Sequence, residues 1–300
     1  MNGSRVLAVQ VQRAADLPGV EIRKVDRWSE QWRCYCRGFE FAVSQAWSGE
    51  VFLRGFRGEV RRGSVVACYP GEVYTTPKLH RAGSGYAVTI DADTLLQHLA
   101  AHGVAKTDLT LRRISKPSSR LARSLTRLLD AFDAEATASD RERSFVGFVA
   151  ALAAELDRDT ALSPLVARAD ECFDFVSAEP PDLDTLCARS GLSRFQALRQ
   201  FKRRYGLPPH AYQLCVRIGF AQRALLSGAS AAMVAAEYGF ADQSHFSRHF
   251  KRIVGLTPAA YAATRSCELR APTLRSQYPR APRSRGGRAC DASPALCLAT

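Results

Sequence analysis

A repeated segment in the C-terminal half constrains the fold more than any other feature of this sequence. GLSRFQALRQFKRRYGLPPHAY, residues 191–212, aligns with GFADQSHFSRHFKRIVGLTPAAY, residues 239–261, when the second copy takes one extra residue in its turn. The residues that recur at a constant offset are Arg199, Phe201, Lys202, Gly206, Leu207, Pro209 and Tyr212 in the first copy, and Arg248, Phe250, Lys251, Gly255, Leu256, Pro258 and Tyr261 in the second. Two similar structural units are therefore expected in one chain.

In each copy, a first helix is expected to end at a glycine, and a polar residue then begins a second helix. We place the first helices at residues 182–189 and 231–238. The glycines suit a left-handed turn, and Ser193 and Asp242 can accept hydrogen bonds from the free N–H groups of the next helix. The pattern predicts two helix-turn-helix units within a compact all-α domain.

Hydrophobic spacing gives each second helix one buried face and one outward face. The residues expected to be buried are Ala197, Phe201 and Tyr205 in the first copy, and Phe246 and Phe250 with Ile253 or Val254 in the second. The residues expected to face outward are Arg194, Phe195, Leu198, Arg199 and Lys202 in the first copy, and Gln243, Ser244, Ser247, Arg248 and Lys251 in the second. A single exposed arginine is usually only solvated, but outward positions that recur in two units predict a binding surface.

The outward residues have the chemistry that reads DNA. Arginine can bind guanine through two hydrogen bonds, glutamine can read adenine, and serine or lysine can hold phosphate. Phe195 and Leu198 differ because they are apolar. A contact with a thymine methyl group or a sugar would explain them, and a dimer or domain contact would also explain them.

Residues 239–261 resemble the signature of the AraC/XylS family of bacterial transcription regulators, which is a long and specific motif. The segments PDLDTLCARSGLS and PHAYQLCVRIGFAQRALLSG are similar to the family's first unit and linker helix, so the resemblance covers about a hundred residues. It implies a seven-helix domain in which a linker helix, here about Pro209 to Leu226, holds two recognition helices. These helices would enter successive major grooves on one face of the duplex, roughly 34 Å apart.

The resemblance also implies which residues contact DNA. The family's contacting positions fall on Arg194, Phe195, Leu198 and Arg199 in the first recognition helix, and on Gln243, Ser244, His245, Ser247 and Arg248 in the second. Leu198 departs from the family's pattern, in which a polar reader is common at this place. His245 has two interpretations, a DNA contact or a local cap or packing contact. Together with Lys202 and Lys251, these residues form the candidate DNA-binding set.

The N-terminal half has a different pattern. The segments FEFAVSQAW, VFLRGF, GSVVACYPGE and GYAVTID are apolar or alternating runs between turn residues, and several such strands between about residues 20 and 95 predict an antiparallel sandwich or barrel. FRGEVRRGSVVACYPGEVYTT and GYAVTIDADTLLQHL resemble the sensor region of the arabinose-regulator type, which implies a cupin-like β-barrel. Tyr74 stands where that region has a histidine.

Residues 120–156 show helical spacing of leucine and phenylalanine in two runs, separated by the polar segment ATASDRER at residues 136–143. This pattern predicts a helical hairpin with the polar segment as its turn. The apolar stripe of the hairpin can cover the sheet or pair with another subunit. The resemblance implies dimerisation through these helices.

No clear catalytic or metal-binding motif stands out. Cys34 and Cys36 form a lone C-x-C, and His98 and His102 lack a third ligand. His80 is the one other histidine in this half, whereas a metal-dependent cupin enzyme needs several histidines and a carboxylate. We therefore expect no enzyme activity, no metal and no cofactor. The alternatives are a cupin-type enzyme fused to a DNA-binding module and a constitutive regulator whose barrel only dimerises.

Aromatic residues in the N-terminal half have two interpretations. They can line a small-molecule site in the mouth of the barrel, or they can form ordinary core. The residues concerned are Trp28, Trp32, Tyr35, Trp47 and Tyr74. No ligand-binding residue is assigned from the sequence.

Composition indicates the cellular compartment and the class of partner. The net charge of +13 suggests a polyanionic partner, and the Arg-, Pro- and Ser-rich segment after residue 264 predicts a disordered basic tail that either attracts phosphate or is dispensable. Nine cysteines, an odd number in a chain without an export signal, indicate reduced thiols. No apolar run is long enough to span a membrane. We therefore expect a cytoplasmic protein.

Together these patterns predict an α+β multidomain chain. We divide it into a cupin-like sensor domain at residues 1–115, a helical hairpin for dimerisation at 116–160, an AraC-type double helix-turn-helix domain at 161–264 and the basic tail at 265–300. The expected function is sequence-specific, effector-responsive activation of transcription. The expected partners are double-stranded DNA, RNA polymerase, a small-molecule effector and a second copy of the chain, with no membrane.

Overall fold

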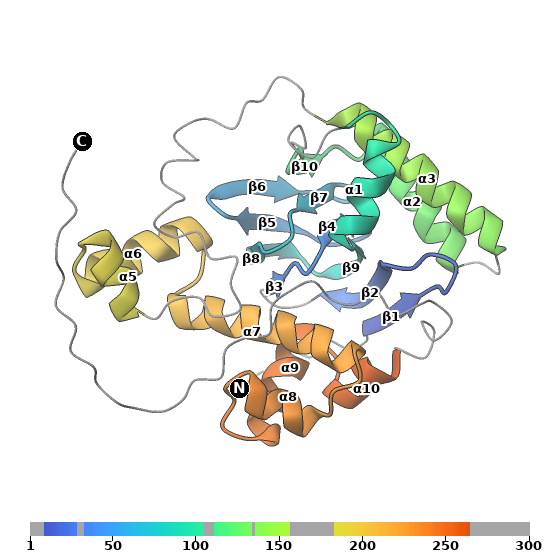
Figure 1. The fold of residues 1–300 in the computed structure, drawn as a ribbon. Helices are drawn as coiled ribbons and strands as arrows, with labels where there is room; N and C mark the ends of the chain where they lie inside the picture. Colours follow the sequence, from blue (N-terminus) through green and yellow to red (C-terminus); the bar gives the residue numbers. More distant parts are fainter. Residues whose placement is uncertain (1–8, 29–32, 105–110, 134–135, 157–182, 265–300) are drawn as a thin grey trace, which may run out of the picture.

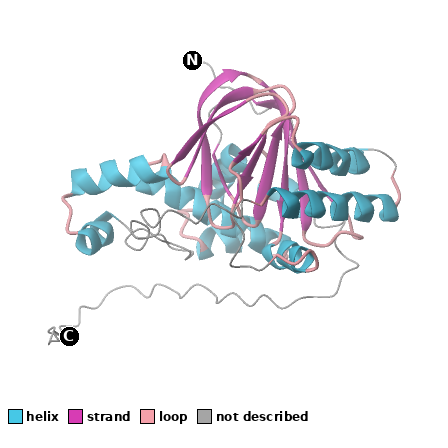
Figure 2. Ribbon diagram, turned by 90° about the horizontal axis from the view of Figure 1, so that it is seen from above, coloured by secondary structure: helices cyan, strands magenta, loops and turns pink. Residues whose placement is uncertain are grey.

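The structure is a computed structural model that describes residues 9–28, 33–104, 111–133, 136–156 and 183–264. Its N-terminal half is rich in strands and its C-terminal half is helical (Figures 1 and 2). This division confirms the predicted order of a β-rich domain followed by a helical domain. Within the described residues, no helix is both long and apolar enough to cross a membrane. The segment 157–182 and the predicted basic tail lie outside these residues.

Two antiparallel sheets form the N-terminal domain. The six-stranded sheet has the order β1-β2-β9-β4-β7-β10, and the four-stranded sheet has the order β3-β8-β5-β6. The strands are β1 (Val9–Arg13), β2 (Val20–Trp28), β3 (Arg33–Tyr35), β4 (Phe39–Ser44), β5 (Ser48–Leu53), β6 (Phe56–Val60), β7 (Val65–Cys68), β8 (Val73–Arg81), β9 (Gly83–Ile90) and β10 (Ile114–Ser115). Strand β1 lies before the predicted strand region, although its V-Q-V-Q alternation is a strand signal.

The cupin-like barrel implied by the resemblance is not present as one closed sheet. Every strand pairing among the described residues lies within one of the two sheets, and none joins them. The strands therefore form a two-layered sandwich, which is one of the two arrangements that the strand pattern predicts. The sandwich still encloses a core between its layers, and this core contains Trp47, Val51, Leu53 and Val66.

The central strand β4 shows why both faces of the larger sheet are covered. Phe39, Phe41 and Val43 belong to one hydrophobic cluster, and Ala42 belongs to the cluster between the sheets. Successive side chains of a strand point to opposite faces, so a strand that is buried at every position needs a partner layer on each side. The four-stranded sheet covers one face, and helices cover the other.

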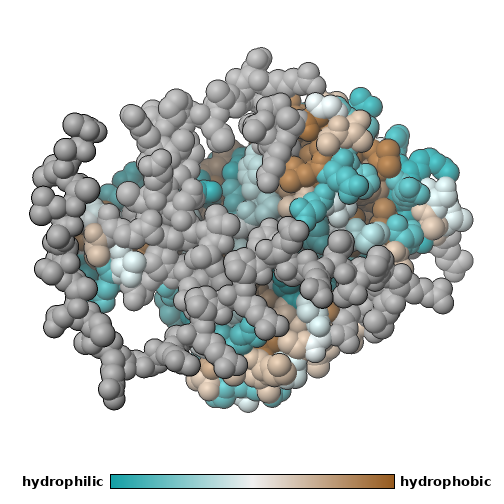
Figure 3. Space-filling view, viewed as in Figure 1, coloured by the Kyte–Doolittle hydropathy of each residue, from teal (hydrophilic) through white to brown (hydrophobic). Residues whose placement is uncertain are grey.

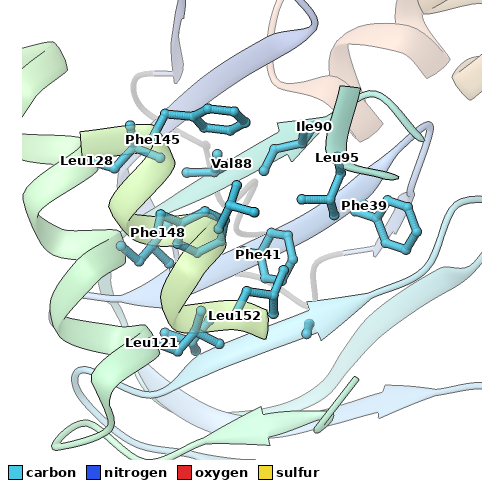
Figure 4. Close-up of a cluster of buried hydrophobic side chains, with 14 of the residues drawn as sticks. Phe39, Phe41, Val88, Ile90, Leu95, Leu121, Leu128, Phe145, Phe148 and Leu152 are labelled. Atoms are coloured by element: carbon cyan, nitrogen blue, oxygen red, sulfur yellow. The ribbon is translucent and has the colours of Figure 1, made fainter. Parts of the chain in front are cut away.

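Helices α1 (Ala92–Ala100), α2 (Arg120–Asp133) and α3 (Ala138–Glu155) cover the outer face of the six-stranded sheet (Figures 1 and 4). The Phe148 ring of α3 meets the Phe41 ring of β4 edge-on, with centroids 5.0 Å apart. On the face of the molecule seen in Figure 3, hydrophobic side chains remain visible beside these helices. The helical hairpin therefore covers the sheet, which is one of its two predicted roles.

The turn of this hairpin is shorter than predicted. Helix α3 begins at Ala138, inside the polar segment 136–143 that the sequence assigns to the turn. Thr137 Oγ1 accepts a hydrogen bond from Asp140 N at 3.2 Å, and Asp140 Oδ2 accepts one from Thr137 N at 3.2 Å. This capping box satisfies the first N–H groups of the helix, so a helix can start within a polar sequence.

The helical domain follows the predicted order closely. Its helices are α5 (Leu183–Ser190), α6 (Arg194–Tyr205), α7 (Pro209–Leu226), α8 (Ala231–Glu237), α9 (Gln243–Val254) and α10 (Pro258–Ala263). The predicted linker helix is confirmed as α7, and α5 and α8 begin and end within one residue of their predicted bounds. One cluster of buried side chains, which includes Phe201, Ile218 and Phe250, joins these helices.

Candidate nucleic-acid interface

Helix α6 begins at a turn with the predicted chemistry. Gly191 has a φ of +66°, in the left-handed region that favours glycine. Ser193 then caps the helix, because its hydroxyl accepts a hydrogen bond from Gln196 N at 3.4 Å and Gln196 Oε1 accepts one from Ser193 N at 3.1 Å. The residues between α5 and α6 thus determine where α6 starts and how its faces are oriented.

One face of α6 is buried as predicted. Ala197, Phe201 and Tyr205 are at most 5% exposed, and Phe201 and Tyr205 pack into the core of the helical domain. The outward residues of the candidate DNA-binding set on this helix are all exposed, namely Arg194, Phe195, Leu198, Arg199 and Lys202. The helix therefore presents one continuous face that is open to a partner.

Two of the outward residues are large, apolar and exposed. Phe195 is 72% exposed and Leu198 is 38% exposed. The Arg199 guanidinium lies over the Phe195 ring, 5.9 Å from its centroid, and this cation-π contact can order the arginine without neutralising it. Arg194 instead forms an exposed ion pair with Asp184 of α5 at 3.1 Å. Arg199 thus combines a ring-stacked side chain with an outward charge.

Helix α9 repeats the construction of α6. The Asp242 carboxylate accepts a hydrogen bond from His245 N at 2.6 Å and caps the helix as predicted. The buried residues are Phe246, Phe250, Ile253 and Val254, all at most 4% exposed, so both alternatives for the last buried position are occupied. The outward residues are Gln243, Ser244, Arg248 and Lys251, which are exposed, and Ser247, which is half-buried.

His245 packs within its own unit. Its half-buried ring lies edge-on to the His249 ring with centroids 4.5 Å apart, and the two Nε2 atoms are 2.9 Å apart. Arg252 donates a hydrogen bond to His249 Nδ1 at 2.7 Å, so a neutral His249 carries its proton on Nε2 and donates it to His245. The local packing contact, one of the two interpretations of His245, is therefore present. A DNA contact from this residue stays a prediction.

Neither α6 nor α9 contains an acidic residue. Their basic residues are Arg194, Arg199, Lys202, Arg203 and Arg204 in α6, and Arg248, Lys251 and Arg252 in α9. A surface with this density of positive charge attracts a polyanion over a distance comparable to the screening length of the solution. Both outward faces therefore suit the phosphate backbone of a nucleic acid.

The internal repeat is preserved in the packing of aromatic rings. The Phe201 ring meets the Tyr212 ring edge-on with centroids 5.5 Å apart, and the equivalent rings of Phe250 and Tyr261 meet edge-on at 5.5 Å. Each tyrosine follows the Gly-Leu-x-Pro joint that ends the second helix of its unit. The two units are therefore built on the same internal contact as well as on the same sequence.

Helix α7 holds the turn of the second unit in place. Arg217 donates a hydrogen bond to the carbonyl oxygen of Gly239 at 3.1 Å, and its guanidinium lies over the Phe240 ring, 5.6 Å from the centroid. The sequence did not single out Arg217 for any role. Only the folded arrangement brings α7 beside the turn between α8 and α9.

The interior of the N-terminal domain holds a buried ion pair that the sequence did not predict. Arg23 Nη2 lies 3.1 Å from Glu40 Oε2, and both side chains are at most 4% exposed. Burial raises the pKa of Glu40 above its ordinary value, although Arg23 acts in the opposite direction. Of the aromatic residues proposed for a ligand site or for the core, Trp47 and Tyr74 are 2% exposed and belong to the core between the sheets. The side chains of Trp28 and Trp32 lie outside the described residues.

One group of potential metal ligands occurs among the described residues. Glu50, Glu59 and His80 of the four-stranded sheet bring their ligand atoms within 4.8 Å of one another. His80 Nε2 lies 3.2 Å from Glu59 Oε1, and Arg57 Nη1 lies 3.5 Å from Glu50 Oε2. These side chains are half-buried or exposed and already pair among themselves and with a cation, and they do not converge inside the sandwich as a cupin-type metal centre requires.

Comparison with known proteins places the clearest similarity in the helical domain. A family described as a helix-turn-helix domain matches residues 186–264. The chain is 30% identical over 116 residues to the HTH-type transcriptional regulator MtrA of Neisseria gonorrhoeae, a region that is 36% of this chain and 38% of MtrA. The matched region thus spans less than half of that regulator's length.

Two solved structures also align with this chain. An AraC-type transcriptional regulator from Chromobacterium violaceum is 30% identical, with 30% of this chain and 80% of that chain covered and a TM-score of 0.28. ToxT from Vibrio cholerae is 12% identical, with 82% of this chain and 98% of that chain covered and a TM-score of 0.45. MtrA and the Chromobacterium protein are both described as transcriptional regulators.

Proposed function

We propose that the chain is a bacterial transcription regulator of the AraC/XylS type, a sequence-specific protein that reads two successive major grooves of DNA with α6 and α9; the helix-turn-helix match over residues 186–264 and the similarity to MtrA support this. The residues assigned to the interface are Arg194, Phe195, Leu198, Arg199 and Lys202 in α6, and Gln243, Ser244, His245, Ser247, Arg248 and Lys251 in α9. No catalytic step and no cofactor are part of this function.

The observation that carries the proposal is the matched outward face of the two helices. Arg199 and Lys202 on α6 are exposed, and the equivalent Arg248 and Lys251 on α9 are exposed as well. In each unit these residues lie opposite a buried aromatic stripe, so the core of the domain fixes the direction in which they point. A solvated surface has no reason to repeat such positions in two units, whereas DNA offers two equivalent grooves.

The side chains divide naturally into base readers and phosphate contacts. Arg199 and Arg248 have the length and the planar donor pair that guanine accepts, and Gln243 at the start of α9 suits adenine. Lys202 and Lys251 lie in the last turns of their helices and suit contacts with phosphate. In α6 the apolar Phe195 and Leu198 replace polar readers, so this unit is assigned a preference for thymine methyl groups beside the base that Arg199 contacts.

The two grooves are read together because α7 joins the units. One long helix contributes to the cores of both units and makes the Arg217 contact with the turn at Gly239. Recognition helices held on a common support meet successive major grooves when they lie roughly 34 Å apart along one face of the duplex. The binding site is then a pair of half-sites separated by about one helical turn.

The remaining parts of the chain are assigned to regulation. We assign residues 1–115 to a cupin-like sensor of a small-molecule effector, 116–160 to a homodimer contact, 161–264 to DNA binding and 265–300 to a basic tail. The regulator acts as an activator that contacts RNA polymerase. An effector changes this activity only by binding one arrangement of the domains more tightly than another.

Selection of bound fragments from genomic DNA tests the proposal. The full-length protein is incubated with sheared DNA, with and without a small-metabolite extract, and the retained fragments are sequenced. We expect enriched fragments that share two half-sites about one helical turn apart. Retention that depends on salt but not on sequence would instead show a nonspecific DNA anchor and would contradict base reading by α6 and α9.

A thermal-shift measurement tests the sensor assignment separately. A ligand that binds the folded sensor raises the melting temperature by mass action. We expect one fraction of the metabolite extract to raise the melting temperature of the full-length protein. If every fraction leaves it unchanged, the N-terminal domain serves only dimerisation, and the protein is a constitutive regulator.

A further inference from the structure

The sensor domain contacts both DNA-binding units in the segment that follows the second helix of each unit, at residues 206–212 and 255–261. Gly206 and Tyr212 of the first unit match Gly255 and Tyr261 of the second. Residues of β5 and of the loop after it reach the first of these joints, and residues of β1 and β2 reach the second. The two contacts use different chemistry, because the sensor itself has no matching repeat.

A buried hydrogen-bonded cluster forms the contact with the second unit. The Tyr261 hydroxyl donates to Glu21 Oε2 over 3.2 Å, and Arg13 binds the same carboxylate oxygen and lies 3.3 Å from the tyrosine oxygen. Arg37 Nη2 also approaches Glu21 Oε2, at 2.6 Å. The side chains of Glu21 and Arg13 are buried, and Tyr261 is fully buried. Charge-assisted hydrogen bonds of this kind have a defined geometry and hold α10 against the sheet.

Close apolar packing forms the contact with the first unit. Phe52 of β5 is 8% exposed and lies so close to Gly206 that a Cβ at position 206 would be 2.6 Å from Phe52 Cδ1. Gly206 also has a φ of +74°, in the left-handed region that favours glycine. Both the backbone conformation and the close Phe52 ring therefore favour glycine at this position. Arg54 follows two residues later, and its charge acts to lower the pKa of Tyr212, which burial raises.

A third contact lies between these two, on the linker helix. The Tyr35 ring of β3 covers Gly219 in the middle of α7, where a Cβ would lie 2.1 Å from Tyr35 Cδ1. The same ring lies 5.9 Å from the Phe220 ring, measured between centroids. The sensor therefore touches the helical domain at the end of the first unit, along α7 and at the end of the second unit.

The assigned DNA-reading faces are not covered by these contacts. Arg199 and Lys202 of α6, and Arg248 and Lys251 of α9, are all exposed while the sensor is docked. The docked arrangement thus leaves both recognition helices open to a partner. A contact that blocked DNA would have to bury some of these side chains.

We propose that the docked sensor is a brace that sets the distance between the two recognition helices, with Tyr261 and Phe52 as the positioning residues that determine which half-site spacing is bound. The brace acts on the DNA-binding function proposed above and rests on it. Each positioning residue fastens one unit to the same rigid sandwich. The two units then keep one mutual orientation that suits one spacing of half-sites.

The physical consequence concerns simultaneous binding of two half-sites. When two binding modules are held at the correct distance, the second half-site is bound at a high effective concentration. Loosening either unit lowers that effective concentration, because the orientation of the two units must then be fixed when DNA binds, and this costs conformational entropy. The affinity for a single half-site does not depend on the brace. Loss of the brace should therefore weaken binding to DNA with the preferred spacing of half-sites. It should also reduce the difference in affinity between that spacing and the others.

A distance measurement on the free protein tests the brace without DNA. Spin labels are introduced as a genetically encoded amino acid at Gln200 of α6 and Ala236 of α8, which are both exposed, in the full-length chain. We expect one narrow distance distribution, and a broader one in Tyr261→Phe and in Phe52→Ala. The control is Tyr69→Phe, which removes a phenol that accepts a hydrogen bond from Leu111 N within the sensor and leaves the interface intact.

The second measurement uses DNA in which the two half-sites are moved apart by single base pairs. We expect Tyr261→Phe and Phe52→Ala to bind the preferred spacing roughly five- to tenfold more weakly, to bind a single half-site with unchanged affinity, and to lose much of the discrimination between spacings. Tyr69→Phe should keep the wild-type spacing profile. A variant that is merely less stable would lose affinity for every DNA in proportion.

The outcomes separate the brace from the DNA-binding function. Unchanged distance distributions in both variants, or an unchanged spacing profile, would overturn the brace even if the protein binds DNA specifically. Tighter binding by both variants would also overturn it, because the sensor would then be an inhibitor. If distances broaden but wild-type protein selects no DNA sequence, the brace is physically present and the proposed function is wrong.

Discussion

Tyr261 in α10 donates a hydrogen bond over 3.2 Å to the Glu21 carboxylate in β2, across 240 positions of sequence. The contact joins the last described helix to one of the first strands, and both residues are buried. Arg13 and Arg37 bind the same carboxylate oxygen, so one acidic group serves as the acceptor for donors from both domains. The stability of the interface between the domains therefore depends on the ionisation of Glu21.

The stability of the protein should decrease in acid because of Glu21. Burial acts to raise the pKa of this carboxyl, but Arg37, Arg13 and Arg23 lower it well below its ordinary value of 4.5. A carboxyl with a lowered pKa in the folded state stabilises that state above the unfolded pKa, and this contribution is lost as the pH falls below it. We expect the free energy of unfolding, measured in urea, to decrease from about pH 4.5 downward.

Glu21→Gln isolates this contribution. The variant should be less stable than wild type at pH 7 and should lose stability less steeply in acid, because position 21 no longer titrates. Glu142→Gln, on the exposed face of α3, should keep the wild-type slope. Parallel pH profiles for wild type and Glu21→Gln would show that this carboxyl has the same pKa in the folded and unfolded states.

Gly219→Ala should destabilise the protein even though alanine is the better helix former. Alanine is favoured over glycine inside a helix by about 1 kcal/mol. At this position, however, a Cβ would lie 2.1 Å from Tyr35 Cδ1, so the ring or the helix must move. We expect a net loss of roughly 1 to 3 kcal/mol in the free energy of unfolding.

A second background separates the two effects at Gly219. In Tyr35→Ala the obstructing ring is absent, so Gly219→Ala should become neutral or stabilising there. The four proteins form a double-mutant cycle with a coupling between positions 35 and 219. Equal effects of Gly219→Ala in both backgrounds would mean that Tyr35 does not restrict this position.

The N-caps of α6 and α9 should each contribute measurably to stability. Ser193 accepts a hydrogen bond from Gln196 N, and Asp242 accepts one from His245 N. Replacement of either residue by alanine should cost roughly 0.5 to 2 kcal/mol in denaturant unfolding. Ser227→Ala is the matched control, because that exposed hydroxyl donates to the Arg223 carbonyl and caps no helix start. If Ser227→Ala loses as much free energy of unfolding as the cap variants, the assignment of Ser193 and Asp242 as caps is wrong.

His249 should titrate at an unusually low pH. Burial, Arg252 and His245 together lower its pKa from 6.5 to about 4, so the ring is neutral near pH 7. Because the folded pKa is the lower one, protonation favours the unfolded chain, and stability from this residue is lost as the pH falls from 6.5 toward 4. Nitrogen NMR of the histidine rings should show the titration near pH 4 in wild type and at higher pH in Arg252→Ala. A midpoint near 6.5 in wild type would contradict the His245–His249–Arg252 arrangement.

The local features of the helical domain were predictable from sequence because they depend on neighbours in the chain. The buried stripe of Ala197, Phe201 and Tyr205 follows from helical spacing, and the cap at Ser193 follows from its place between two helices. The bounds of α7 follow from proline at its start and the glycine-containing joint after Leu226. Such signals lie within a few residues of the element that they define.

The contacts between the domains were not predictable in the same way. Glu21 and Arg13 resemble ordinary charged residues of alternating strands, and Gly219 resembles a weak point in a helix. Their roles depend on which strand edge meets which helix, and this information is distributed over the whole fold. The start of α3 at Ala138 was missed for a smaller reason, because the reciprocal hydrogen bonds of Thr137 and Asp140 outweigh the polar character of the segment.

The most direct test of the central claim compares Arg199→Ala with Arg248→Ala in a selection from random DNA duplexes. Each variant should lose roughly 1 to 3 kcal/mol of specific binding and should relax the preference at one base pair, and the two relaxed positions should lie about one helical turn apart. Arg143→Ala, on the exposed face of α3, should leave affinity and preference unchanged. If both variants keep the wild-type sequence preference, or both relax the same base pair, α6 and α9 do not read separate half-sites.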